Sequence, residues 1–330
     1  MTYFFLDLPR AFQICKGRGS KECILLLMSK KKTALAQKEV EIFLQEQFSR
    51  EIKNVRPMIE GEDSQAFAFE WDEAGYVIRI NKTIEGFQKD AYAYCNFHSA
   101  SVPIPKVIQI GNIDEYHAFC ISERMPGITL QDLDSESMQR LLQPTTDIWL
   151  ALQDIDLSHT TGAGNFDIDG HGRYTTWRHY LFSILDTASY DWDLVAHSID
   201  QTRLKKLMTV FASLIEYCPE ERHLVHGDFG SNNMLTDGHC ITAVLDWDCA
   251  KYGDPLFDIA TAYFWSPWLD CMATQAAYYE KHLSNMADYR ERLLCYQLRI
   301  GLTEIYENVV HQNGEMARWA MKRCAAIAKI

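Results

Sequence analysis

The chain has 330 residues, of which 47% are hydrophobic, and it carries a formal net charge of −13. This composition excludes a disordered chain and supplies enough apolar material for two lobes or one large domain. No apolar run approaches the roughly 20 residues that span a bilayer. The acidic balance argues against a nucleic-acid partner and favours a small cationic one.

The charge is unevenly distributed along the chain, and the cysteines show no metal-binding pattern. Residues 1–32 contain seven basic and two acidic residues, which leaves 25 basic and 43 acidic residues in the rest of the chain. This segment lacks periodicity and the pattern of a signal peptide, so we expect a poorly ordered N-terminal extension. The ten cysteines form no CxxC pair and no zinc-ligand spacing. They are typical of reduced thiols in a cytoplasmic protein.

The first part of the chain after this extension alternates helix and strand patterns. Apolar residues recur at helical spacing from Ala36 to Phe48, which predicts an amphipathic helix. Residues 66–71 and 76–80 flank a turn and predict a β-hairpin. The next expected elements are a helix at 86–99 and strands at 107–110 and 117–123.

The pattern changes after the break at Met125-Pro126-Gly127 and becomes mostly helical. The expected helical stretches lie around 135–155, 174–186, 200–217, 255–283 and 288–328. This order predicts an α+β fold with two lobes. A small lobe with an antiparallel sheet would cover 33–123, a hinge 124–128, and a larger helical lobe 129–330. Ligands usually bind in a cleft between such lobes.

One stretch of the helical part carries the residues for chemistry. His226-Gly-Asp228 leads to Asn233, and a predicted hairpin then runs from Met234 to Leu245 before Asp246. Antiparallel pairing would return Asn233 and Asp246 to the same end of the hairpin. An amide oxygen and a carboxylate are suitable ligands for Mg²⁺.

Asp228 lies on the loop that leads to these ligands, where its carboxylate could accept a proton from a hydroxyl group that attacks a phosphate. Taken singly, an Asp beside a Gly is usually a turn residue, but the joint spacing of Asp228, Asn233 and Asp246 is specific for phosphoryl transfer. We expect His226 to brace the loop. Two-metal phosphoesterases also use such residues, but they need a His where this chain has Met234.

The sequence resembles a known family in these segments. His226–Asn233, Leu245–Asp248 and Gly253–Ala260 are similar to the signature segments of the aminoglycoside phosphotransferase family, which has a protein-kinase-like fold. Further segments are similar to the branch of this family that phosphorylates hygromycin B, namely 61–67, 103–105, 127–133, 174–178 and 264–269. The resemblance extends from about Met28 to near the C-terminus.

The resemblance implies an ATP- and Mg²⁺-dependent kinase in which Asp228 is the catalytic base and Asn233 and Asp246 hold the metal. The hinge around Ser122 to Met125 would bind adenine through its backbone. The candidate nucleotide-binding residues of this hinge are Glu123, Arg124 and Met125. The loop from Gly61 to Gln65 would cover the phosphates, where Ser64 could donate a hydrogen bond.

The phosphate-binding strand departs from the family pattern, because Arg79 stands where a Lys is usual. A guanidinium can clamp phosphates but does not simply replace an ammonium group. Its partner on the following helix would be Asp90, with Glu85 as the alternative. Asp258 is expected to brace the catalytic loop, and Asp254-Pro255 is typical of the start of a helix.

A polycationic, sugar-like substrate needs carboxylates and flat aromatic faces. The candidates are Trp177, Trp265, Trp268, Asp270, Glu304 and Glu307. For each of them the alternative is a core Trp or a solvated Glu. We expect a monomer that phosphorylates an antibiotic hydroxyl. A kinase for a choline-like or sugar metabolite is the alternative, and a nucleotide-binding pseudokinase is disfavoured by the intact acidic residues.

Overall fold

The computed structural model describes residues 35–48, 51–58, 64–267 and 269–330. The expected N-terminal extension, most of the loop at 61–65, and Trp268 lie outside these residues. The described residues fall into two compact units. We call them the sheet unit, which comprises 35–151 and 231–249, and the helical unit, which comprises 152–230 and 250–330. Among the described residues, none of the helices has the length and apolar character needed to cross a membrane.

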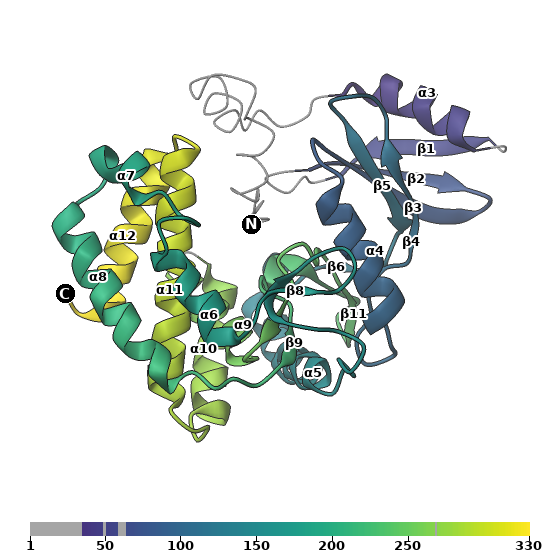
Figure 1. The fold of residues 1–330 in the computed structure, drawn as a ribbon. Coiled ribbons are helices and arrows are strands. Elements are labelled where there is room, and N and C mark those ends of the chain that lie inside the picture. Colours follow the sequence, from purple (N-terminus) through teal and green to yellow (C-terminus); the bar gives the residue numbers. More distant parts are fainter. Residues whose placement is uncertain (1–34, 49–50, 59–63, 268) are drawn as a thin grey trace. The chain divides into compact units, whose positions relative to one another are not determined.

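The sheet unit is built on an antiparallel sheet that has, in the described part of the chain, five strands in the order β1-β2-β3-β5-β4 (Figure 1). The strands are β1 (Ile52–Pro57), β2 (Gln65–Trp71), β3 (Ala74–Asn81), β4 (Val107–Asn112) and β5 (Ala118–Glu123). The predicted hairpin is confirmed, because β2 and β3 pair with Phe67 opposite Ile78. The edge strand β1 was not predicted, since most of its side chains are exposed and its apolar residues do not alternate.

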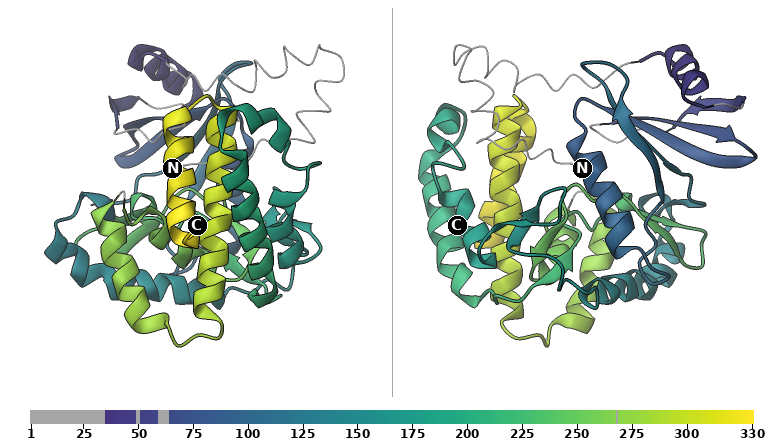
Figure 2. Two further views of the ribbon diagram at one scale, coloured as in Figure 1. Left: turned by 90° about the vertical axis from the view of Figure 1, so that its left-hand side faces the viewer. Right: turned by 45° about the vertical axis from the view of Figure 1, so that its right-hand side comes forward.

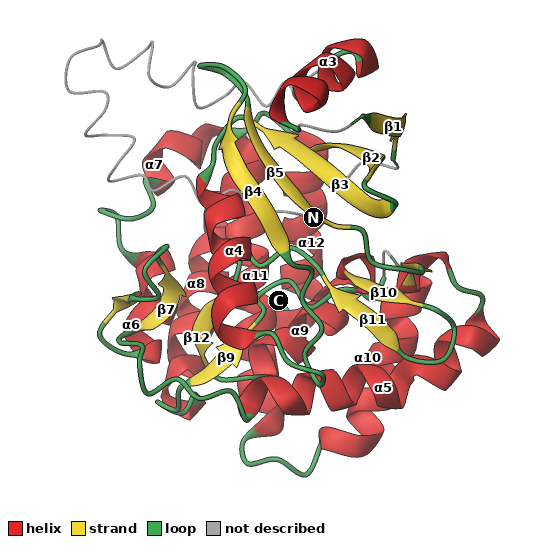
Figure 3. Ribbon diagram, turned by 90° about the vertical axis from the view of Figure 1, so that its right-hand side faces the viewer, coloured by secondary structure: helices red, strands yellow, loops and turns green. Residues whose placement is uncertain are grey.

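Two helices accompany this sheet, as Figure 3 shows. Helix α3 (Gln37–Gln47) is the predicted amphipathic helix, and its Val40 and Leu44 join a core with Phe67, Ile78 and other residues of the sheet. Two glutamines of α3 also bond the backbone of β1. Gln37 Nε2 donates to the Val55 carbonyl at 2.8 Å, and Gln45 Oε1 accepts from the Ile52 N–H at 3.1 Å. Helix α4 (Glu85–Phe97) corresponds to the helix expected at 86–99.

The remaining elements of the sheet unit form a smaller antiparallel sheet, in the described residues ordered β11-β10-β6. They are β6 (Ile128–Thr129), β10 (Met234–Thr236) and β11 (Ile241–Val244), with α5 (Ser135–Gln153) following β6. The pairing of β10 with β11 confirms the hairpin predicted next to the candidate metal ligands.

The helical unit contains a small sheet whose described strands run in the order β8-β7-β12-β9. Its strands are β7 (Ala163–Phe166), β8 (Gly172–Tyr174), β9 (His223–Val225) and β12 (Lys251–Gly253). Its helices are α6 (Trp177–Phe182), α7 (Trp192–Val195), α8 (Gln201–Leu214), α9 (Leu256–Trp265), α10 (Asp270–Leu283), α11 (Tyr289–Val310) and α12 (Gly314–Ala328). Helices α11 and α12 lie side by side (Figure 2).

These elements confirm the predicted α+β class and refine the helical stretches. The stretch expected at 255–283 is divided into α9 and α10, and that at 288–328 into α11 and α12. The second break has a clear cause, because Gln312 has a φ of 60° and the side chain of Asn313 caps α12 by accepting from the Met316 N–H. The lobe bounds at 33–123, 124–128 and 129–330 stay a prediction.

Candidate active site

The loop with Asp228 is held by a carboxylate from α9, the next α-helix along the chain. Strand β9 ends at Val225, and Asp258 of α9 accepts hydrogen bonds from the backbone N–H groups of His226 at 2.8 Å and Gly227 at 2.7 Å. The His226 ring accepts from the Asp228 N–H through Nδ1 at 3.3 Å, and this ring is fully buried. The expected bracing contacts of His226 and Asp258 are therefore present.

The brace is also an electrostatic feature. Asp258 is buried, and burial raises the pKa of its carboxyl group. The charge of His226, the two backbone hydrogen bonds and the charge of Lys251 act in the opposite direction. Lys251 is itself buried and lies over the Phe257 ring, with 4.7 Å from its Nζ to the ring centroid. The loop thus rests on a buried cluster of ionisable groups.

Asp254 has a larger role than the helix start that the sequence predicts. Its Oδ1 accepts from the Leu256 N–H at 3.0 Å, which fits that role. Arg292 of α11 also donates to Asp254 twice, from Nε at 2.8 Å and from Nη2 at 2.6 Å. The Tyr296 hydroxyl donates to Oδ2 at 2.5 Å. Burial lowers the pKa of Arg292, but its bonds to Asp254 raise the pKa more, so the net shift is upward.

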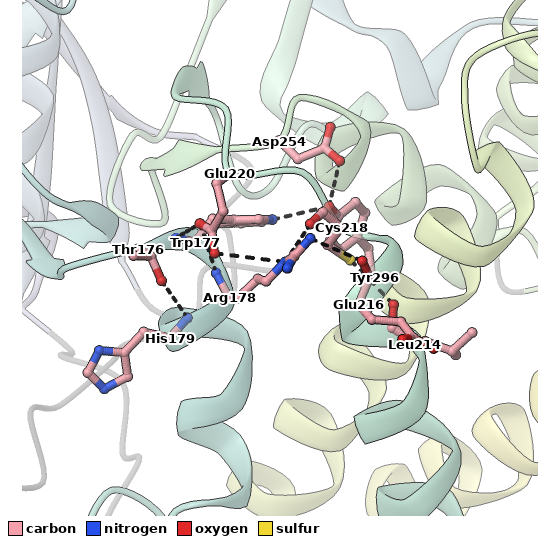
Figure 4. Close-up of polar contacts among 10 residues, drawn as sticks. All are labelled: Thr176, Trp177, Arg178, His179, Leu214, Glu216, Cys218, Glu220, Asp254 and Tyr296. Atoms are coloured by element: carbon pink, nitrogen blue, oxygen red, sulfur yellow. Dashed lines mark hydrogen bonds and ion pairs between the residues drawn. The ribbon is translucent and has the colours of Figure 1, made fainter.

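Trp177 belongs to this network rather than to a surface that a ligand could reach (Figure 4). Its side chain is 1% exposed, its ring stacks on Tyr180 at 4.9 Å, and its Nε1 donates to the Tyr296 hydroxyl at 3.1 Å. A Cβ atom at Gly253 would lie 2.1 Å from the Trp177 ring, so the glycine makes room for the indole. The structure gives Trp177 a packing role, and its expected substrate contact stays a prediction.

Three of the remaining substrate candidates, Trp265, Asp270 and Glu304, lie on three helices of the helical unit. Trp265 is 4% exposed and stacks on Trp319 of α12, with ring centroids 5.1 Å apart. Glu304 is 1% exposed and accepts from Asn308 Nδ2 at 3.1 Å, whereas Asp270 is exposed at the start of α10. The stacking of Trp265 on Trp319 was not predicted, because a Trp on an Ala-rich helix indicates only core packing. The substrate roles stay predictions.

Backbone pairing brings the chain positions of the two candidate metal ligands close together within the sheet unit. Met234 pairs with Val244, and the Leu245 N–H donates to the Asn233 carbonyl at 2.8 Å. Asn233 therefore lies opposite the residue that precedes Asp246, as the hairpin argument expected. Asp246 has a φ of 65°, in the left-handed region that a non-glycine residue rarely adopts.

Arg79 and Asp90 are joined in the same unit. The Arg79 guanidinium forms an ion pair with Asp90, so the helix partner is Asp90 rather than Glu85. Asp90 Oδ1 also accepts from the Trp247 N–H at 2.8 Å. Burial alone lowers the pKa of Arg79, but the charges of Asp90 and Asp246 contribute to a net rise. The guanidinium is therefore firmly cationic and linked to the segment that carries Asp246.

The nucleotide candidates at the strand ends have defined partners. The Glu123 N–H donates to the Lys106 carbonyl at 2.9 Å, and the Arg124 N–H donates to the Gly75 carbonyl at 3.0 Å. Of the three hinge residues, Met125 is thus the better donor for an adenine ring. Ser64 Oγ accepts from Asn81 Nδ2 at 3.2 Å, which leaves its own hydroxyl proton to donate.

The donor set fits magnesium. Within the described residues, no group of three or more His, Cys, Asp or Glu side chains could hold a metal ion. Asn233 and Asp246 instead offer one amide and one carboxylate oxygen, and Mg²⁺ commonly takes one or two protein ligands and completes its shell with water and phosphate oxygens.

The braced loop in the helical unit and the two-oxygen donor set in the sheet unit each have the kind of residues that phosphotransferases use. A profile described as the phosphotransferase enzyme family matches residues 54–294, and the chain belongs to this family.

Individual members of this family can also be compared with the chain. The chain is 42% identical to hygromycin-B 4-O-kinase of Escherichia coli over 299 residues, which cover 91% of this chain and 87% of the relative. The crystal structure of aminoglycoside phosphotransferase APH(4)-Ia matches with a TM-score of 0.84 and 42% identity, over 89% of this chain and 99% of that one. A thermostable mutant of APH(4)-Ia in ternary complex with AMP-PNP and hygromycin B matches with a TM-score of 0.83 and 43% identity, over 88% and 98%.

Proposed function

We propose that this protein transfers the γ-phosphoryl group of ATP to a hydroxyl group of an aminoglycoside, with hygromycin B as the acceptor. The observation that carries this proposal is the 42% identity to hygromycin-B 4-O-kinase over nearly the whole chain. The net charge of −13 suits a polycationic acceptor. Resistance to the antibiotic would follow from its phosphorylation.

In this reaction Asp228 accepts the proton of the attacking hydroxyl group. The hydrogen bonds that Asp258 accepts from the His226 and Gly227 N–H groups support this role, because a base must be held within about 0.5 Å of its productive position. Asn233 and Asp246 would hold Mg²⁺, which when bound would neutralise charge that develops on the phosphate oxygens. Arg79, oriented by Asp90, binds the phosphates of the nucleotide, and Ser64 donates to them.

The adenine ring would bind at the hinge through the Met125 N–H and neighbouring carbonyl groups, because the N–H groups of Glu123 and Arg124 already donate to backbone carbonyls. The acceptor pocket would use Asp270 and Trp268 for direct contact. Trp265 and Glu304, which are nearly buried, would line its floor. These assignments follow the chemistry of a cationic sugar, which needs carboxylates and flat rings.

The test is the release of ADP with hygromycin B, with other aminoglycosides, with choline and simple sugars, and without acceptor. We expect turnover with hygromycin B and a loss of at least about 100-fold in Asp228→Asn. The matched control is Asp237→Asn, in the exposed turn between β10 and β11. Turnover with choline or sugars alone would favour the metabolite kinase, and full activity of Asp228→Asn would refute the base.

Magnesium dependence, the cytoplasmic location and the monomeric state are part of the same proposal. Removal of divalent cations with EDTA should abolish turnover, and added Mg²⁺ should restore it. Light scattering coupled to size exclusion should give a mass close to 38.1 kDa. A mass of twice this value would refute the monomer.

A further inference from the structure

Lys89 on α4 is a buried cation that none of the proposed steps uses. Its side chain belongs to the buried set, at 7% exposure, and its Nζ donates a hydrogen bond to the backbone carbonyl of Asp248. A buried ammonium group is costly unless it is hydrogen-bonded. Its partner here is a peptide group two residues after a candidate metal ligand, so the position of Lys89 bears on that ligand.

Helix α4 contacts the segment 246–248 at several points along one face. Asp90, the next residue, accepts from the Trp247 N–H at 2.8 Å. One turn earlier, a Cβ atom at Gly86 would lie 3.2 Å from Asp248 Cγ, so the helix backbone at Gly86 lies close to the Asp248 side chain. At the end of the helix, the Phe97 ring lies 6.3 Å from the Trp247 ring.

Two neighbouring residues of α4 therefore hold two neighbouring residues of the segment. Asp90 binds a backbone donor and Lys89 a backbone acceptor, and both bonds lie just after Asp246. The left-handed backbone of Asp246 is unfavourable for a residue with a Cβ atom, so bonds to the residues that follow it help to hold it.

We propose that Lys89 is a positioning residue for the metal site: by holding the Asp248 carbonyl, it fixes the backbone that aims the Asp246 carboxylate at the nucleotide-bound cation. The inference rests on the proposed function, because it takes Asp246 as a metal ligand. Lys89 acts through the peptide chain and touches neither nucleotide nor metal. Outer groups that orient metal ligands typically change metal affinity by about 10- to 100-fold when they are removed.

The test measures Mn²⁺ binding to the ADP complex by electron paramagnetic resonance and, separately, ADP binding without metal by calorimetry. We expect Lys89→Met to weaken Mn²⁺ binding by about 10- to 100-fold and to leave metal-free ADP binding unchanged. Lys89→Arg, which keeps a donor, should recover most of the Mn²⁺ affinity. The matched control is Lys53→Met, at an exposed position of β1 in the same unit.

Two results would overturn the inference. Unchanged Mn²⁺ affinity in Lys89→Met would remove the positioning role. An equal loss of metal-free ADP binding would identify Lys89 as a phosphate ligand or a general support of the fold. If Lys89→Met does not fold, Lys89→Gln takes its place under the same two criteria. Loss of Mn²⁺ affinity in an enzyme that does not phosphorylate hygromycin B would support Lys89 and refute only the acceptor.

Discussion

The buried ion pair of Asp254 and Arg292 should dominate the stability of the helical unit. Asp254 has no exposed side-chain surface, and Arg292 has 8%. The change Asp254→Ala removes both carboxylate acceptors of the guanidinium, which keeps its bond to the Ala287 carbonyl, and leaves its charge buried. Breaking such a pair from one side costs about 3–5 kcal/mol, because desolvation of the remaining charge is no longer offset. Arg292→Met should cost a similar amount from the other side.

Urea unfolding followed by tryptophan fluorescence measures this cost. With a slope of about 3 kcal/mol/M, a loss of 3–5 kcal/mol lowers the midpoint by roughly 1–1.7 M. The double variant Asp254→Ala/Arg292→Met should lose clearly less than the sum of the single losses, because neither charge then remains alone. The reasoning is refuted if the single losses are below about 1 kcal/mol, or if they add in the double variant.

Three other predictions concern the loop brace, the packing of Trp177 and the phosphate clamp. Burial raises the pKa of Asp258, so the folded state binds the proton of this carboxyl group more tightly than the unfolded chain does. The stability that results is present at acidic pH and is lost as the pH rises from about 4 through the pKa of the folded state. The stability of wild type relative to Asp258→Asn should therefore fall as pH rises over this range, and a constant difference in urea unfolding would contradict it. Gly253→Ala should lower stability by about 1–3 kcal/mol, since the added Cβ meets the Trp177 ring, and Trp177→Phe should recover part of the loss in thermal unfolding; an unchanged melting temperature would speak against this packing. Arg79→Lys should raise the KM for ATP about tenfold and leave the KM for hygromycin B unchanged, because Lys cannot reproduce the planar fork; equal changes in both constants would argue for a general loss of structure.

The sequence predicted those contacts that depend on local pattern. The hairpin of β10 and β11 has alternating residues around a tight turn, so the neighbourhood of Asn233 and Asp246 followed from pairing alone. The Arg79 and Asp90 contact was expected from the resemblance to the family, in which a cation on this strand has a partner on the helix that follows.

Contacts between distant segments could not be predicted in this way. Arg292 lies 38 residues after Asp254, and no local pattern links a residue in the first turn of α11 to a residue just before α9. For Trp177 the sequence left a substrate contact and a core position open, because aromatic residues serve both, and its packing against Gly253 is visible only in the structure. Strand β1 was missed because an exposed edge strand has no apolar alternation.

The glutamines of α3 bear on how the chain can be shortened. An uncovered edge strand invites another chain to extend the sheet. Gln37 and Gln45 bind a carbonyl and an amide of β1 with side-chain amides, which have the same donor and acceptor groups as a neighbouring strand. A truncation that begins after α3 would remove this substitute for a neighbouring strand, so the shortest well-behaved version of the protein should begin before Gln37.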